Sequence, residues 1–270
     1  GGACPAPVLS LIKEWDKNRD EDILVPITVG MHRWRPLYYF PWRLKVDKAV
    51  FRGRPYCHTK HMPYTQGVCS RTYFAAMTQT HPEWSRFLDV GLLEGYNFTF
   101  RGGSGGGSGG MGGSGNSSAS RNSSSSSGSS RMLVAARGFV PTEELARFRY
   151  VLALDGITAS SRLAKLLSMN SVVLKQTSPW IEWYYRSLVP GTHYVSFWNH
   201  HRTDVLQAIK HIRHKAKYLT DTATHGQAFA YRYLSPTARR LYWRRTLLEY
   251  RNLFADMDEY LAGVELPDTE

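Results

Sequence analysis

The chain has 270 residues, enough to bury a full hydrophobic core and to form one or two domains. Hydrophobic residues make up 42% of the chain and aromatic residues 13%, which indicates a globular protein and argues against a disordered or fibrous one. The formal charge of +12 favours an anionic partner: nucleic acid, a membrane surface or a phosphorylated small molecule. No run of about 18 apolar residues occurs, so we expect no transmembrane helix, and the first residues lack the pattern of a signal peptide.

The cysteines and their neighbours leave two alternatives near the start of the chain. There are three cysteines, so they cannot all pair within one chain, but Cys57 and Cys69 can form a disulfide across a loop in a secretory lumen. His58 and His61 lie between them and would allow a zinc site, although this spacing matches no common zinc pattern. N-glycosylation sequons, which are compatible with a lumenal location, start at Asn97, Asn116 and Asn122.

In chain order, the first predicted strand is Ala49–Phe51, and a basic turn of Arg52, Gly53 and Arg54 follows it. Glycine permits a sharp turn, and the arginines are suited to phosphate or sugar; a solvated basic turn is the alternative. A helix is expected over Cys69–Thr80, beginning with Ser70 and Arg71, and then a strand at Phe87–Leu92. Residues 102–131 are almost entirely Gly, Ser and Asn, so we expect a flexible loop that carries no chemistry.

The stretch Tyr150–Gln176 predicts a strand, a tight turn at Asp155-Gly156, a helix and a second strand at Ser171–Leu174. Ser160 or Ser161 would cap the helix, whose start is a natural phosphate site to which Arg162 adds a charged donor. Parallel strands with a right-handed crossover follow from this order. No GxGxxG or GxxxxGK[ST] motif is present, so the usual signals for nicotinamide and ATP are missing.

Later segments continue the alternation of strands and helices, which favours an α/β fold with a parallel sheet. We expect a helix starting at Thr142 and leading to Arg149. The further predicted elements are an aromatic helix at Trp180–Leu188, a strand at His193–Val195, an amphipathic helix at Asp204–Arg213 and a last helix from Ser235 to about Leu261. His193 is expected to be a structural strand histidine. His211 and His214 are expected on a solvated helix face, with a metal pair as the alternative.

Several of these segments resemble glycosyltransferase family 90, which contains capsule-associated proteins and Rumi-like protein O-glucosyltransferases. The similarity is most specific over LDGITASSRLAKLLSMNSVVLKQ, and it extends to the run AVFRGR, to the DVG of the predicted strand at Phe87–Leu92 and to the His193-Tyr194 pair. The resemblance implies a Rossmann-like parallel sheet that forms the donor-binding half of a GT-B-type glycosyltransferase, plus part of the acceptor half. It also implies three regions: an acceptor-side remnant at 1–48, a nucleotide-sugar domain at 49–261 interrupted by the loop 102–131, and a tail at 262–270.

The same resemblance assigns the donor site. The arginines would meet the pyrophosphate, the turn after Asp155 would supply backbone and hydroxyl contacts, and a glutamate would face the nucleotide ribose. The implied donor-binding residues are Arg52, Gly53, Arg54, Ser70, Arg71, Gly156, Ile157, Thr158, Ala159, Ser160, Ser161, Arg162 and Glu182. The catalytic aspartate of the family is expected before Gly1, so we expect a fragment that binds a donor but transfers sugar poorly.

The implied function is transfer of glucose or xylose from a UDP-sugar to a protein or glycan hydroxyl, in the lumen of the endoplasmic reticulum or Golgi. No metal or other cofactor is expected beyond the UDP-sugar itself. The alternative is a non-catalytic basic α/β module that binds nucleic acid or an acidic polymer. The segment Arg239–Arg251 is rich in arginine and aromatic residues, yet no nucleic-acid-binding motif accompanies it, and aromatic residues at helical spacing are usually core.

Overall fold

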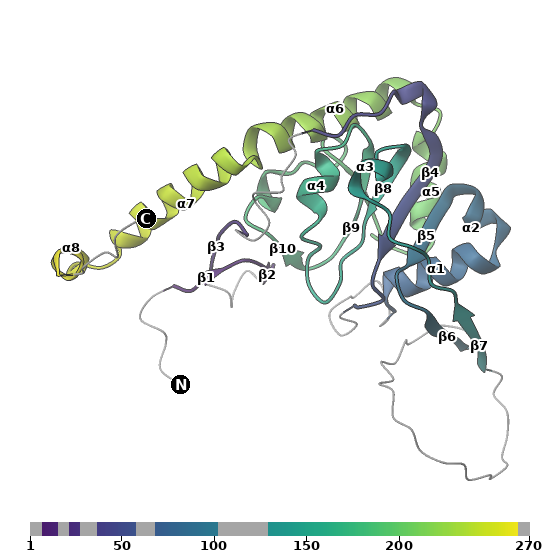
Figure 1. The fold of residues 1–270 in the computed structure, drawn as a ribbon, viewed down its shortest axis with the longest axis horizontal. Coiled ribbons are helices and arrows are strands. Elements are labelled where there is room, and N and C mark those ends of the chain that lie inside the picture. Colours follow the sequence, from purple (N-terminus) through teal and green to yellow (C-terminus); the bar gives the residue numbers. More distant parts are fainter. Residues whose placement is uncertain (1–6, 16–21, 28–36, 58–67, 102–128, 264–270) are drawn as a thin grey trace, which may run out of the picture.

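The computed structural model describes residues 7–15, 22–27, 37–57, 68–101 and 129–263, and its centre is a five-stranded parallel sheet (Figure 1). The strands lie in the order β11-β9-β8-β4-β5, and every neighbouring pair is parallel. Their bounds are β4 Val46–Gly53, β5 Leu88–Leu92, β8 Phe148–Ala153, β9 Val172–Gln176 and β11 Val195–Phe197. The expected α/β class is therefore confirmed.

The inner strands β9, β8 and β4 bury residues on both of their faces, as expected for parallel strands covered by helices. On β4, Phe51 packs into one core and Val50 into the other. The first core contains side chains of α1 Ser70–Thr80, α2 Pro82–Phe87 and α5 Asp204–Ile212. The second contains side chains of α4 Leu163–Leu167 and α6 Ala216–Tyr233. The domain is thus a three-layer α/β/α arrangement.

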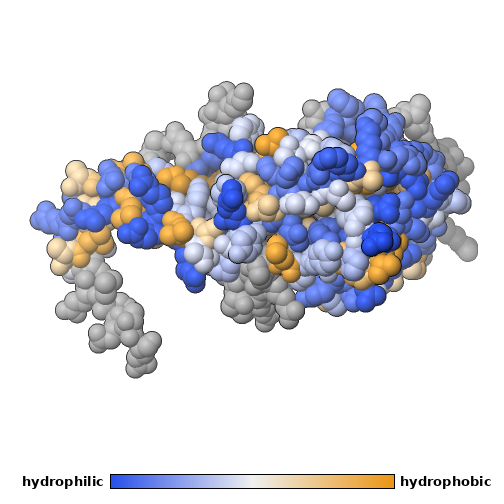
Figure 2. Space-filling model, turned by 90° about the horizontal axis from the view of Figure 1, so that it is seen from above, coloured by the Kyte–Doolittle hydropathy of each residue, from blue (hydrophilic) through white to orange (hydrophobic). Residues whose placement is uncertain are grey.

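Two further parts extend from this body. A hairpin of β6 Tyr96–Arg101 and β7 Ser129–Val134 projects at the lower right of Figure 1. At the other end, α7 Pro236–Arg251 forms an arm that leads to α8 Met257–Ala262. Figure 2 shows hydrophilic and hydrophobic side chains interspersed along this arm, and none of the residues of α7 is buried.

The N-terminal segments lie against this arm. The hydroxyls of Tyr242 and Tyr250 donate hydrogen bonds to the carbonyls of Leu24 and Pro7, at 3.1 and 2.9 Å, and the Trp243 indole donates to the Pro26 carbonyl at 3.0 Å. The remaining short elements are β1 Leu9–Ser10, β2 Lys13–Glu14, β3 Ile23–Leu24, β10 Trp180–Ile181, α3 Thr142–Leu145 and two 3-10 turns, Trp42–Leu44 and Tyr185–Ser187. Strand β1 pairs with β3, and β2 pairs with β10.

Four predictions about elements were wrong. The helix expected at Trp180–Leu188 is instead the strand β10 followed by a 3-10 turn, because its first residues pair with β2. The helix starting at Thr142 stops at Leu145, since β8 begins at Phe148. The last helix breaks after Arg251, and the capping serine of α4 is absent: Arg162 occupies that position, and no side chain caps the helix. The 18-residue helix α6 was not predicted at all.

The other expected strands and helices are present with small shifts of their ends. The predicted disulfide also forms, between Cys57 and Cys69 with their Cα atoms 5.4 Å apart. The alternative zinc site is excluded because both sulfurs are used; His58 and His61 lie outside the described residues. No described helix is long and apolar enough to cross a membrane.

The hairpin allows a direct test of whether the Gly/Ser-rich segment contributes to stability. Arg101 and Ser129 are paired with each other, and residues 102–128 connect them. We predict that replacing residues 102–128 with Asn-Gly preserves the fold and stabilises it by about 2 kcal/mol, because a shorter loop costs less closure entropy. The measurement is thermal unfolding, with an unrelated Gly/Ser segment of equal length as the control that should leave Tm unchanged. A lower Tm for the shortened chain would show that residues 102–128 contribute packing.

Candidate functional site

The candidate site lies where the order of strands along the sheet reverses. From β4 the chain first runs to β5 on one side and then returns to β8, β9 and β11 on the other. In open parallel sheets of this order, ligands bind beyond the carboxyl ends of the two strands that flank the reversal. Here those strands are β4 and β8, and the loops that follow them enclose a hollow of about 420 Å³.

Ten of the thirteen predicted donor residues line this hollow. The loop after β4 and the first turn of α1 contribute one group, and the turn after β8 contributes the other. Tyr56 and Leu93 complete the lining and were not predicted. The predicted residues brought together are Gly53, Arg54, Arg71, Gly156, Ile157, Thr158, Ala159, Ser160, Ser161 and Arg162.

Two arginine side chains share one aromatic ring at this site. The guanidinium carbon of Arg162 lies 4.9 Å from the centre of the Phe51 ring, and that of Arg71 lies 5.4 Å from it. Arg71 also donates to the carbonyls of Leu154 and Arg54, at 3.0 and 3.2 Å, and Arg162 donates to the carbonyl of Arg52. The ring and the carbonyls therefore hold both cationic groups in fixed positions.

In the described part of the chain neither cation forms a direct ion pair with a carboxylate, although the charge of the buried Asp155 acts on Arg71. Burial, and then the charge of Arg162, lower the pKa of Arg71 to about 10. Burial also lowers the pKa of Arg162. The Nε of Arg71 is buried and has no hydrogen-bond partner. Two partly desolvated guanidinium groups facing one hollow favour binding of an anion that offers several oxygens.

Two glycines make room for these arginines. A Cβ on Gly156 would lie 2.9 Å from an Nη of Arg71. A Cβ on Gly53 would lie 2.6 Å from the Phe51 ring and 3.1 Å from an Nη of Arg162. Any other residue would displace these groups, so close approach explains glycine at both positions.

A buried carboxylate fixes the turn that follows β8. Asp155 accepts a hydrogen bond from the backbone N–H of Ser160 at 3.0 Å and a second one from the Ser178 hydroxyl. Burial raises the pKa of Asp155, while the neighbouring charge of Lys175 acts in the opposite direction. Loops after two neighbouring strands are thereby tied together at the carboxyl edge of the sheet. This role of Asp155 was not predicted from the sequence. The visible signal was its charged neighbour Lys175, which interrupts the apolar pattern of a valine-rich buried strand.

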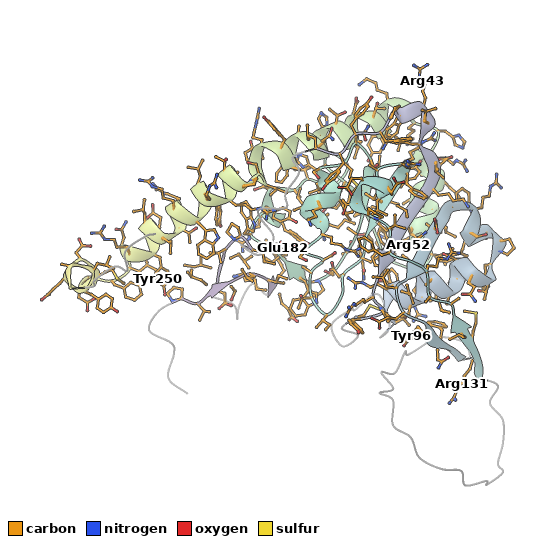
Figure 3. All side chains as sticks on the ribbon, in the orientation of Figure 1. Arg43, Arg52, Tyr96, Arg131, Glu182 and Tyr250 are labelled. Carbon is orange, nitrogen blue, oxygen red and sulfur yellow. A yellow bond between two sulfur atoms is a disulfide. The ribbon has the colours of Figure 1, made fainter. Side chains whose placement is uncertain are left out.

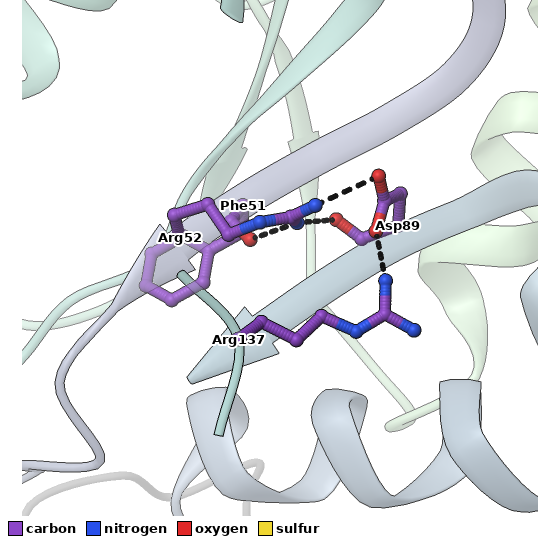
Figure 4. Close-up of polar contacts among 4 residues, drawn as sticks. All are labelled: Phe51, Arg52, Asp89 and Arg137. Atoms are coloured by element: carbon purple, nitrogen blue, oxygen red, sulfur yellow. Dashed lines mark hydrogen bonds and ion pairs between the residues drawn. The ribbon is translucent and has the colours of Figure 1, made fainter. Parts of the chain in front are cut away.

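The other three predicted residues lie outside the lining of the hollow. Arg52 turns away to Asp89, donating to its carboxylate at 2.9 Å and to its carbonyl at 2.8 Å; Arg137 binds the same carboxylate at 2.8 Å (Figure 4). Ser70 is buried and donates to the side chain of Gln176 at 2.7 Å. Because Gln176 also accepts from the backbone N–H of Asp155, at 3.2 Å, Ser70 supports the turn indirectly.

Glu182 is buried and lies well apart from Arg52 in the view of Figure 3. Burial raises its pKa to about 8, with Arg239 and Lys175 opposing that rise and Asp155 adding to it. Lys175 belongs to the same polar cluster, and its Nζ lies 4.8 Å from the centre of the Tyr185 ring. The predicted contact of Glu182 with a ribose stays a prediction.

Among the described residues no three His, Cys, Asp or Glu side chains form a group suited to a metal ion. The Nδ1 of His193 accepts a hydrogen bond from the backbone of Val189 at 2.9 Å, and its ring packs on Phe229, in line with a structural role.

Comparison with known proteins finds a partial similarity to one family. Residues 134–261, a little less than half of the chain, match the model of glycosyl transferase family 90. The match includes the turn after β8 and Glu182, whereas Gly53, Arg54 and Arg71 precede it.

Similar proteins include the human "Protein O-glucosyltransferase 3", which is 30% identical over 120 residues, or 44% of this chain and 24% of that protein. "Protein O-glucosyltransferase 2" of Danio rerio is 29% identical over 120 residues, with the same shares. "O-glucosyltransferase rumi" of Drosophila pseudoobscura pseudoobscura is 28% identical over 117 residues, or 43% of this chain and 29% of that protein. The match thus spans about a quarter of the length of these relatives.

Among solved structures, the crystal structure of Anabaena Alr3699/HepE in complex with UDP-glucose is similar over 42% of this chain and 32% of that one. The identity is 12% and the TM-score is 0.34. The architecture described above therefore rests on this chain's own sheet and helices.

The buried Glu182 gives a prediction about pH. Its pKa of about 8 in the folded protein exceeds its usual value of 4.5, so the folded state binds this proton more tightly than the unfolded state does. The corresponding stability is fully present below about pH 4.5 and is lost as the pH rises towards 8. Glu182→Gln mimics the protonated form, so its Tm should gain on the wild type across this window.

Thermal unfolding between pH 5 and 8 measures this difference. Glu249→Gln, which changes an exposed carboxyl on α7, is the matched control and should differ from the wild type by a nearly constant amount. If the Tm curves of Glu182→Gln and the wild type run parallel, Glu182 is not held protonated by its surroundings.

Proposed function

We propose that the chain supplies the nucleotide-sugar-binding part of a glycosyltransferase that moves glucose or xylose from a UDP-sugar to a protein or glycan hydroxyl. The observation that carries the proposal is the pair Arg71 and Arg162, which face one hollow at the reversal of strand order without a direct ion pair to a carboxylate among the described residues. A diphosphate offers the anionic oxygens that two fixed guanidinium groups bind well.

The turn after β8 supports the same proposal. Thr158, Ser160 and Ser161 bring backbone and hydroxyl groups to the lining beside Arg162. Since α4 has only five residues, its dipole adds little, and the arginines supply most of the positive charge. The donor is proposed to bind without a metal ion, its diphosphate being neutralised by these side chains.

The match of residues 134–261 to the family 90 model supports sugar transfer, and the relatives' names point to glucose and to protein acceptors. We further propose a GT-B-type arrangement in which residues 49–261 form the donor domain and residues 1–48 belong to the acceptor side. The hydrogen bonds from α7 to Pro7, Leu24 and Pro26 support this, because they join the last long helix to segments that lack a core of their own. No catalytic base is assigned within this chain.

A location in the lumen of the secretory pathway is part of the proposal. The disulfide between Cys57 and Cys69 supports it, since such bonds persist mainly in oxidising compartments. The bond also connects the loop after β4 to the start of α1, the two elements that bring Arg54 and Arg71 to the hollow.

We predict that Arg162→Ala and Arg71→Ala each weaken UDP binding roughly 10- to 150-fold, the equivalent of about 1.5–3 kcal/mol for a hydrogen bond to a charged group. Isothermal titration calorimetry with UDP measures the loss. Arg137→Ala is the matched control, because it removes the same charge nearby but its side chain binds Asp89 outside the hollow. Normal UDP affinity in both site variants would refute the assignment.

Thermal unfolding of the same variants separates an effect of the substitution on UDP binding from an effect on the stability of the fold. Arg162 contacts the Phe51 ring and the Arg52 carbonyl, so a modest change in Tm is expected, in contrast to a fully exposed arginine.

A second titration decides between the two classes of function. UDP and a generic oligonucleotide are compared at low and high salt, because backbone contacts to a nucleic acid weaken steeply with salt. The donor site predicts saturable UDP binding that depends on Arg71 and Arg162. Oligonucleotide binding that exceeds UDP binding and ignores both substitutions would instead indicate the basic binding module.

A further inference from the structure

The β6–β7 hairpin presents one face to solvent and the other to the core. Phe98 and Val134 are buried, whereas Asn97 and Leu133 are exposed, Leu133 to 63%. Asn97 lies directly opposite Leu133 in the antiparallel register, so both side chains are on the outward face. Neither residue lines the candidate donor site.

The hairpin is held in this orientation by contacts with the body. A two-stranded hairpin alone is marginally stable, so such contacts matter. The side chain of Gln79 on α1 donates to the Leu133 carbonyl at 3.1 Å and accepts from the Ala135 N–H at 3.2 Å. Tyr96 and Met132 pack against the core that contains Phe98. The outward position of Asn97 is therefore fixed by the fold.

Asn97, Phe98 and Thr99 form an N-glycosylation sequon, Asn-x-Thr. The sequon is used only in the secretory pathway, where disulfides also form, and the Cys57–Cys69 bond is independent evidence of exposure to such an environment. An attached glycan needs a solvent-facing asparagine, and the alternation along β6 provides one.

We propose that Asn97 carries an N-linked oligosaccharide, an inference that rests on the lumenal location proposed above but not on donor binding. In the transfer, the anomeric carbon of a lipid-pyrophosphate-linked oligosaccharide forms a bond to Nδ2 of Asn97. Its bond to the pyrophosphate oxygen breaks, the lipid pyrophosphate leaves with the electron pair, and the amide gives one proton to the transferring enzyme. The first sugars then stand beside Leu133 and cover its exposed side chain.

The test is expression of the full 270-residue chain behind a secretory leader in animal cells, with glycopeptide mapping of both the medium and the membrane fraction. Peptide N-glycosidase converts a glycosylated asparagine into aspartate, which mass spectrometry locates. We expect this conversion at Asn97 in the wild type and in Thr99→Ser, which keeps the sequon. It should be lost in Thr99→Ala, which keeps the asparagine but removes the sequon.

An unmodified Asn97 in the wild type overturns the proposal, whether Asn116 and Asn122 carry glycans or not. Titration of UDP against the same preparations keeps the two proposals separable. Normal UDP binding with an unmodified Asn97 refutes only the glycan, whereas a glycan at Asn97 without UDP binding refutes only the donor site.

Discussion

The site depends on a single crowded contact: two guanidinium groups over the buried Phe51 ring, at the point where the strand order of the sheet reverses. The two positive charges repel each other, and burial adds a desolvation cost to each of them. The fold keeps them there with backbone carbonyls as acceptors and with two glycines that leave room. Repulsion and desolvation offset what the ring and the carbonyls contribute, so stability alone does not account for this arrangement, and an anionic ligand is its simplest physical explanation.

A second feature that costs free energy of folding is the buried polar cluster of Asp155, Lys175 and Glu182. Burial raises the pKa of both carboxyls and lowers that of the lysine, so for each of the three groups burial disfavours the charged form. Buried charges seldom add net stability compared with well-packed apolar residues. What Asp155 provides is geometry: its two hydrogen bonds set the turn that carries Ser160 and Arg162 to the hollow.

The sequence predicted the β8–α4–β9 unit well, because Tyr150–Gln176 has strong local signals: an apolar run, Asp-Gly, and leucines at helical spacing. The resemblance carried by this unit also predicted most of the residues that line the hollow. Long-range pairing was not visible: Trp180–Ile181 becomes a strand only because β2 lies beside it. Arg52 was assigned to the donor side, yet Asp89 on the adjacent strand β5 holds its side chain, and no local pattern encodes that pairing. Helix α6 was missed because its buried face is built largely from small or polar residues such as Ala223 and Gly226.

The arm formed by α7 also has a structure that local stability does not explain. A helix of 16 residues without one buried side chain gains little from packing, and its low apolar content gives it no strong face. It nevertheless directs Tyr242, Trp243 and Tyr250 to carbonyls of two N-terminal segments, residues 7–15 and 22–27. The parallel pair β1–β3 has only two residues per strand, far less than an independent sheet requires. The arm and these strands thus depend on each other.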